Sequence, residues 1–310
     1  MKVLSLFSGC GGLDMGFVKN GYDIVWANDI DKYAVQTYKA NFKHEIICGD
    51  INGFDPSLLP EHDMIIGGFP CQPFSIMGSE KGFEDTRGTL FFTIANIIKY
   101  DIENDRKPYA VILENVRSLK THDKGRTFSV IKNVLENDLG YKVFDNVLNS
   151  SDYGVPQTRN RTYLVCFANN SVKYTFPKEQ KLKTTLQDLL EPSVDEKYFL
   201  SDKIIPTILS NGTGGYRGKS EIDLKIARPL CATMAKMHRA CQDNYVTQNG
   251  RIRRLTPREC ARLQGFDDSF VIPVSDSQAY KQFGNAVTVN VADAVAKSVK
   301  TALKKTGEWR

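Results

Sequence analysis

The sequence contains no Cys-x-x-Cys pair, although it has 7 cysteines. An odd number of widely scattered thiols argues against a disulfide framework and against a structural zinc site. Long apolar runs are also missing: Val3–Phe7 meets Ser8 and Gly9 too early for a secretory signal, and nothing later approaches the length of a membrane span. These absences predict reduced thiols, no bound metal, no membrane segment and a cytoplasmic location.

The net charge is a modest +5, but it is unevenly distributed. Residues 201–265 contain 12 Lys and Arg against 5 Asp and Glu. A solvated basic face is the ordinary interpretation of such a run. Here the cations stand among Gly, Tyr, Asn, Gln and His rather than in a lysine-rich helix, which favours a surface that contacts the phosphate backbone of a nucleic acid.

Apolar runs alternate with helical patterns up to about residue 167, which predicts a doubly wound, mostly parallel α/β sheet of seven strands. A chain of 310 residues also predicts a second, smaller domain. The predicted strands are Val3–Phe7, Ile24–Ala27, Glu45–Ile47, Met64–Gly67, Ala110–Glu114, Lys142–Leu148 and Thr162–Phe167.

The C-terminal half has a different pattern. Between residues 170 and 256 the sequence is polar and Gly-rich, which predicts a domain of irregular or β character. A capping box at Thr256–Glu259 predicts a short helix toward Leu263. Apolar residues repeat every four positions over 287–303, which predicts an amphipathic helix that packs on the first domain. We expect 304–310 to be a frayed tail.

Cys71 lies in a rigid turn directly after the predicted strand Met64–Gly67. Open α/β sheets carry their chemistry on the loops beyond the carboxyl ends of such strands. A small buried cysteine is the ordinary alternative. Flanking Pro70 and Pro73 and the neighbouring amide of Gln72 do not suit a packed core, so the pattern favours a nucleophile.

A Gly-rich turn at Phe7–Gly16 follows the first strand and allows close approach of a ligand to the backbone. Such turns serve dinucleotides, methyl donors and plain packing alike, and no P-loop Lys follows. Asp29, about 20 residues beyond the turn, is placed to bind ribose hydroxyls. Asp50, after the third strand, would meet an adenine amino group. A nucleoside cofactor is the simplest interpretation.

Charged residues also follow or precede two later strands. Glu114 ends the fifth strand, on the same rim of the sheet as Cys71, where a surface or capping role is equally compatible. Arg159 and Arg161 precede the seventh strand, and alternation would put both on one face. Two guanidinium groups on one face suit a phosphate or the edge of a base.

Six motifs follow one another along the chain: F-S-G-x-G-G from Phe7, G-F-P-C-Q from Gly68, E-N-V from Glu114, Q-x-R-x-R from Gln157, R-L-T-P-R-E-x-x-R-L-Q-G-F from Arg254 and Q-F-G-N-A-V from Gln282. In this order they resemble the motif series of the DNA (cytosine-5)-methyltransferases. This resemblance implies a Rossmann-like, S-adenosylmethionine-dependent catalytic domain at 1–185 plus 275–310, and a target-recognition domain at 186–274.

The resemblance also implies an activity, namely sequence-specific methylation of cytosine C5 in double-stranded DNA after the base is flipped out of the duplex. Cys71 would add to C6, and Glu114 would engage N3 and the amino group. Arg161 would hold O2, and Arg159 the nearby backbone.

The cofactor contacts follow from the same resemblance. Asp29 stands where a glutamate is more usual, and Ala286 where a serine is frequent. The residues expected at S-adenosylmethionine are Phe7, Gly9, Gly11, Asp29, Ile30, Asp50, Ile51, Pro70, Leu90, Asn285 and Ala286.

For DNA, Ser75–Arg87 looks like a loop that closes over the duplex, with a plain surface loop as the alternative. Met77 stands where some relatives carry a serine. We expect Tyr216 to fill the gap that the flipped base leaves, although a solvated residue is as compatible. The residues expected at DNA are Gln72, Ser75, Met77, Arg87, Tyr216, Arg217, Lys219, Lys236, His238 and Arg239.

Two alternatives stay open, a tRNA cytosine-5 methyltransferase of the same fold and a non-catalytic DNA-binding regulator, although the latter would be expected to have lost Cys71 or Glu114. A zinc deaminase is excluded, because Pro-Cys-x-x-Cys is absent. We expect a monomer, with a cognate restriction endonuclease that acts on the same site without forming a stable complex.

Overall fold

The computed structural model describes residues 1–70, 90–210 and 220–309. The chain forms two compact units. Unit 1 comprises Met1–Leu148, Asn160–Lys178 and Ala292–Arg310, and unit 2 comprises Asn149–Arg159 and Glu179–Val291. None of the helices in the described ranges combines the length and the apolar character that crossing a membrane requires.

Unit 1 is built on a seven-stranded sheet in the order β3-β2-β1-β4-β5-β7-β6. β1 to β5 pair in parallel, and β7 runs antiparallel to β5. All seven predicted strands are therefore confirmed, with small shifts at their ends. Their bounds are β1 Lys2–Leu6, β2 Asp23–Asp29, β3 Ile46–Cys48, β4 Met64–Gly67, β5 Ala110–Val116, β6 Lys142–Asn149 and β7 Asn160–Phe167.

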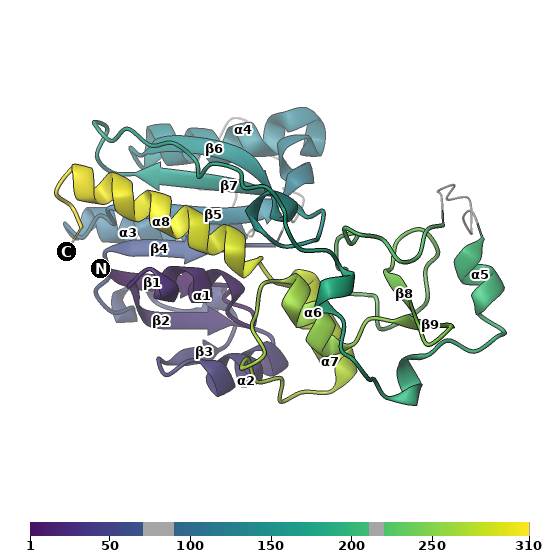
Figure 1. Ribbon diagram of the computed structural model, residues 1–310. Helices are drawn as coiled ribbons and strands as arrows, with labels where there is room; N and C mark the ends of the chain where they lie inside the picture. The colour runs from purple at the N-terminus through teal and green to yellow at the C-terminus, as the bar shows by residue number, and fades with distance from the viewer. Residues whose placement is uncertain (71–89, 211–219, 310) are drawn as a thin grey trace. The chain divides into compact units, whose positions relative to one another are not determined.

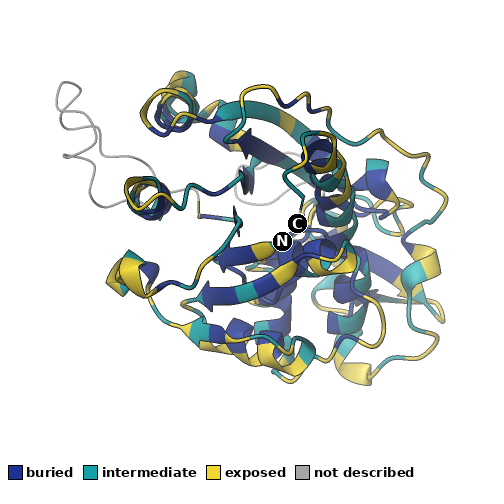
Figure 2. Ribbon diagram, turned by 90° about the vertical axis from the view of Figure 1, so that its left-hand side faces the viewer, coloured by how far each residue is buried: buried dark blue, intermediate teal, exposed yellow. Residues whose placement is uncertain are grey.

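Helices cover both faces of this sheet (Figure 1). α3 (Leu90–Glu103) and α4 (Arg126–Asn133) contribute to one hydrophobic core with alternate residues of β1, β4, β5 and β7. α1 (Gly12–Lys19) and α8 (Val289–Lys305) pack together on the other face, and α2 (Lys32–Asn41) follows β2. Figure 2 shows the strands mostly dark blue, because covering helices bury them from both sides.

The amphipathic C-terminal helix is confirmed as α8, and its partner is α1 with the following turn. Tyr22 donates from its hydroxyl to the Ala296 carbonyl over 3.0 Å. A Cβ on Gly16 would come within 2.5 Å of Ala292, so only glycine allows this approach of the two helices. The expected frayed tail is wrong, because Trp309 packs edge-on against Tyr22 with ring centroids 4.7 Å apart.

Unit 2 contains short elements linked by irregular chain: α5 (Ile205–Leu209), α6 (Pro257–Leu263), α7 (Asp276–Asn285) and the antiparallel strands β8 (Tyr245–Gln248) and β9 (Arg251–Arg254). Asn249 and Gly250 both have positive φ, as a two-residue hairpin requires. The predicted capping box of α6 is present in full. Unit 2 begins earlier and ends later than the expected recognition domain, since α7 and the turn Asn149–Arg159 belong to it.

Candidate active site

An ion pair between a buried glutamate and a half-buried arginine forms on unit 1 where β5 and β7 run side by side. Glu114 lies opposite Tyr163 and Arg161 opposite Val116, so antiparallel pairing puts Glu114 and Arg161 on one face as diagonal neighbours. Arg161 Nε is 3.0 Å from Glu114 Oε1, and the Glu114 side chain is 9% exposed. The structure thus brings together two of the residues expected at the target base.

The chain that leads to Cys71 is anchored beside this pair. β4 ends at Gly67, next to Leu113 of β5, and the Asn115 side chain donates to the Phe69 carbonyl over 2.8 Å. Phe69 itself is buried, and it precedes Cys71 by two positions. The site residues that lie outside the described ranges are Cys71, Gln72, Ser75, Met77, Arg87, Tyr216, Arg217 and Lys219.

The Gly-rich turn after β1 has the backbone that the sequence predicts. Phe7, Gly9 and Gly11 all have positive φ, and α1 begins directly behind Gly11. The Gly9 N–H donates to Asp29 Oδ2 over 2.8 Å, which ties the turn to the end of β2. A Cβ built on Gly9 would meet no atom within 4 Å, so space is open beside this turn.

The ends of β2 and β3 bring the other expected cofactor residues to the same edge of the sheet. Asp29 pairs with Cys48, and the Asn28 amide donates to the Gly49 carbonyl over 2.9 Å. Ile30 is 71% exposed, although it is a large apolar residue. Asp50 receives the Asn52 N–H, and the neighbouring Ile51 is buried.

The other expected cofactor residues are distributed over both units. Leu90 begins α3 and is half-buried, and Pro70 is exposed at the limit of the described chain of unit 1. Asn285 is the last residue of α7 and is exposed, while Ala286, its C-cap, is buried. Both of these belong to unit 2.

Asp14 is a buried carboxyl directly behind the Gly-rich turn, and it was not singled out from the sequence. Ser5 donates to Asp14 Oδ1 over 2.7 Å, and Tyr38 donates to Oδ2. Burial raises the pKa of Asp14 to about 6, and these two hydrogen bonds oppose the rise. The sequence did contain a signal for it, because Asp14 lies on the otherwise apolar face of α1. A carboxyl in such a position predicts hydrogen-bond partners, since burying it unpaired is costly.

The position of Arg159 differs from the expected one, in which it shares one face of a strand with Arg161. The Arg159 side chain is 1% exposed, and its guanidinium donates to the carbonyls of Leu230, Gly284 and Ala286 within unit 2. Arg161, by contrast, meets Glu114 in unit 1. The strand alternation expected for the two arginines is absent, because β7 begins at Asn160 and Arg159 precedes it.

Three of the residues expected at DNA lie in one loop of unit 2. Lys236 is exposed. Arg239 is held by Asp243 over 2.6 Å and by Thr233 over 3.0 Å, so it shapes the loop. His238 contacts Arg254, and burial together with this cation lowers the pKa of His238.

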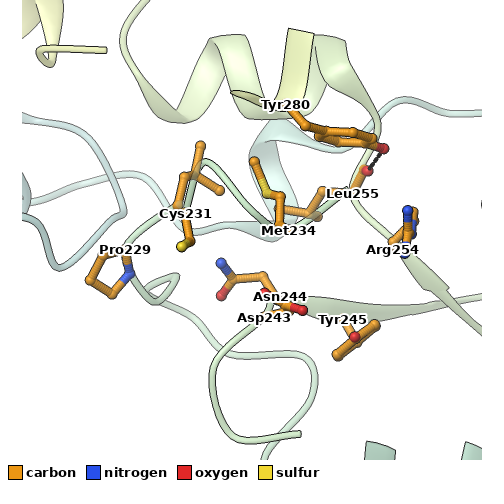
Figure 3. A pocket seen from close by; sticks show the side chains of 10 residues that line it. Pro229, Cys231, Met234, Asp243, Asn244, Tyr245, Arg254, Leu255 and Tyr280 are labelled. Atoms are coloured by element: carbon orange, nitrogen blue, oxygen red, sulfur yellow. Dashed lines mark hydrogen bonds between the residues drawn. The ribbon is translucent and has the colours of Figure 1, made fainter. Parts of the chain in front are cut away.

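A hollow opens beside this loop. Figure 3 shows its walls, with the Tyr280 hydroxyl donating to the Leu255 carbonyl over 2.6 Å. The lining residues are Pro229, Leu230, Cys231, Met234, Asp243, Asn244, Tyr245, Arg254, Leu255 and Tyr280.

Comparison with known proteins supports one family. The model of the C-5 cytosine-specific DNA methylase family matches residues 1–301. The Type II methyltransferase M.NlaX of Neisseria lactamica is 45% identical, covering 97% of this chain and 97% of that protein. The Type II methyltransferase M.HhaI of Haemophilus parahaemolyticus is 38% identical, covering 98% and 95%.

A solved structure supports the fold. The S. pombe Dnmt2 methyltransferase matches with a TM-score of 0.81 at 20% identity, covering 99% of both chains. The mostly parallel sheet of unit 1 is thus that of the S-adenosylmethionine-dependent methyltransferases, and the family matches extend over nearly the whole chain. The chain belongs to the C-5 cytosine-specific DNA methylase family and is a DNA cytosine-5-methyltransferase.

Proposed function

We propose that this protein methylates C5 of cytosine at a specific sequence in double-stranded DNA through a covalent adduct between Cys71 and C6. Cytosine C5 is too weak a nucleophile to accept a methyl group unaided. Addition of the Cys71 thiolate to C6 moves electron density to C5. S-adenosylmethionine, when bound, supplies the methyl group, after which loss of the C5 proton and departure of the thiolate restore the aromatic ring.

The pair of Glu114 and Arg161 is the observation that carries this proposal. Glu114 engages N3 and the amino group of the cytosine, and Arg161 holds O2, so that charge appearing on the ring during addition is met by groups already in place. The pair lies beside Phe69, which is two residues before Cys71. Arg161 also keeps Glu114 oriented before the base arrives.

The cofactor proposal is supported by the open space at Gly9, the Asp29 carboxylate and the exposed Ile30. Asp29 Oδ2 accepts the Gly9 N–H and Oδ1 accepts the Asp31 N–H, so the carboxylate that we assign to the ribose hydroxyls is held at the end of β2. Ile30 would cover the adenine ring, which explains its exposure in the free protein. The other proposed contacts are Phe7, Gly11, Asp50, Ile51, Pro70, Leu90, Asn285 and Ala286.

Recognition of DNA is the proposed task of residues 186–274, with catalysis at 1–185 plus 275–310. The target C6 is shielded in a duplex, so the cytosine must be flipped out. We assign Tyr216 to the gap that the flipped cytosine leaves in the duplex, and we assign the loop Ser75–Arg87 to closure over the DNA. The other residues assigned to DNA contacts are Gln72, Arg217, Lys219, Lys236, His238 and Arg239.

Methyl transfer from tritiated S-adenosylmethionine tests the proposal, with mixed-sequence duplex DNA and tRNA as separate acceptors. We expect label in DNA and its loss with Cys71→Ser, because a serine hydroxyl is a far weaker nucleophile. Cys48→Ser is the matched control, since Cys48 is an exposed thiol that the mechanism does not use. Label in tRNA alone would move the assignment to the RNA enzyme, and label that survives Cys71→Ser would reject the adduct.

The protein is proposed to act in the cytoplasm as a monomer on duplex DNA. Because its relatives are Type II methyltransferases, we also propose a restriction endonuclease that acts on the same site without a stable complex. Sedimentation of the protein alone at micromolar concentration should give a single species of 34.9 kDa. A species of twice this mass would contradict the proposed monomeric state.

A further inference from the structure

Arg159 links two separate backbone segments of unit 2 by donating to three carbonyl groups. Nη1 donates to the Leu230 carbonyl over 3.1 Å, and Nη2 donates to the carbonyls of Gly284 and Ala286 over 2.9 Å each. Gln157, two residues earlier, receives the Leu230 N–H over 2.9 Å. We call these contacts of Arg159 the arginine clasp. Leu230 is therefore held at both its N–H and its carbonyl group.

The clasp satisfies a helix end that would otherwise lack partners. The last carbonyls of an α-helix have no N–H donor within the helix and carry partial negative charge. At the end of α7, the Gln264 amide donates to the Phe283 carbonyl over 2.6 Å, and Arg159 donates to the Gly284 carbonyl. A buried guanidinium is suited to this position, because its charge is opposite to that of the helix end.

Packing around the clasp leaves little freedom for the turn after α7. A Cβ on Gly284 would come within 2.2 Å of the Ala232 nitrogen and 2.3 Å of the Cys231 carbonyl carbon. The peptides of Gly284 and Ala286 are fixed by Arg159, and Asn285 between them is exposed. The clasp therefore holds the backbone on both sides of Asn285 and leaves its side chain accessible.

We propose that Arg159 is a positioning residue for the cofactor, rather than a contact to the DNA backbone. It presents Asn285 and Ala286 to S-adenosylmethionine and fixes Leu230 at the start of the loop that carries Lys236. This inference rests on the proposed function. It assigns the two arginines of the Q-x-R-x-R motif to different tasks, with Arg161 at the target base and Arg159 at the cofactor.

Arg159→Lys tests the assignment, since one ammonium group cannot reach three carbonyls in the fork geometry of a guanidinium. We expect the Kd of S-adenosylhomocysteine, measured by calorimetry without DNA, to rise at least about tenfold, with KM for S-adenosylmethionine rising in parallel. The single-turnover methylation rate at saturating cofactor should stay within about threefold of wild type. Arg258→Lys is the matched control, because Arg258 also donates to backbone carbonyls, those of Asp267 and Phe270. It should leave the Kd unchanged.

A double-mutant cycle with Asn285→Ala separates positioning from a general loss of structure. Once Asn285 is removed, Arg159→Lys should raise the Kd of S-adenosylhomocysteine by only about twofold more. Full additivity would overturn the proposal, as would an unchanged Kd together with a large fall in the single-turnover rate. If Arg159→Lys does not fold, Gln264→Met tests the same turn, and an unchanged Kd in that variant would also overturn it. Methylation by the wild type in the same assays tests the underlying function separately.

Discussion

Glu114 and Arg161 meet because they are diagonal neighbours on two antiparallel strands, so the sheet fixes their geometry before any substrate binds. Such preorganisation is what stabilises charge that develops in a transition state. The geometry also separates their role from that of ordinary ion pairs at the surface, where both side chains are free to reorient in water.

Glu114→Gln is therefore expected to lower the single-turnover methylation rate about 100-fold to 1000-fold, the scale of losing one preorganised group. The amide keeps the shape of the carboxylate, so DNA affinity should change by no more than a few fold. Glu136→Gln is the control, because Glu136 forms an exposed pair with Lys132 in the same unit. A Glu114→Gln enzyme of nearly wild-type rate would remove Glu114 from the reaction.

Asp14 gives a pH dependence whose sign follows from burial. Its pKa is raised from 3.8 to about 6, so the folded state binds the Asp14 proton more tightly than the unfolded state does. The stabilising contribution is fully present below about pH 4 and is lost by about pH 7, and it amounts to about 3 kcal/mol. Asp14→Asn lacks this titration.

Urea unfolding from about pH 4 to about pH 7 checks this prediction. The free energy of unfolding of the wild type should fall relative to that of Asp14→Asn as the pH rises. Asp14 is 0% exposed, which implies that its carboxyl is desolvated. If the free energies of unfolding of the two proteins changed equally with pH, that desolvation would be disproved.

Two of the proposed site residues could be placed on the fold from the sequence because each of them stands at the end of a strand. Glu114 closes an apolar run, and Asp29 stands at the end of another. Arg159 could not be placed in this way, because it precedes β7 and its three acceptors lie 71, 125 and 127 residues further along the chain. Only the folded chain brings those carbonyls together.

At the scale of elements, the strands of unit 1 could be predicted because sheets covered on both faces require continuous apolar runs. The hairpin of β8 and β9 was missed, although Asn249-Gly250 is a strong turn signal. Its strands are short, and β9 consists largely of arginine, so no apolar alternation marked it. The terminal Trp309 was likewise an available signal, since a lone tryptophan favours packing over fraying.

Arg253 and Glu259 hold β9 against the start of α6, and both side chains are 0% exposed. Glu259 also receives the backbone N–H groups of Thr256 and Glu191 over 2.8 Å each. Glu259→Gln leaves a buried guanidinium without its countercharge, so we expect the free energy of unfolding to fall by about 3–5 kcal/mol.

Glu196→Gln provides the comparison, because Glu196 pairs with Arg251 at the surface. This change should leave the free energy of unfolding nearly unchanged, because water screens the pair. Denaturant titration of both variants measures the difference. Equal losses would show that the pair of Arg253 and Glu259 contributes no more than a solvated one.

At the scale of the whole molecule, the six motifs identify the family, but they do not reveal how the chain divides. Asn149–Arg159 leaves unit 1 and returns to it at β7, and Asn285 lies in unit 2 although its expected task is at the cofactor. Such divisions depend on long-range contacts between segments, which local sequence patterns do not encode.

Bisulfite sequencing measures sequence-specific methylation at cytosine C5 base by base. Mixed-sequence duplex DNA would be incubated with the protein and S-adenosylmethionine, then converted and read in parallel with DNA treated with Cys71→Ser. We predict protected cytosines at one position of a single short sequence, all of them absent with Cys71→Ser. Conversion of every cytosine would rule out methylation at C5, and protection scattered without a common sequence would rule out sequence specificity.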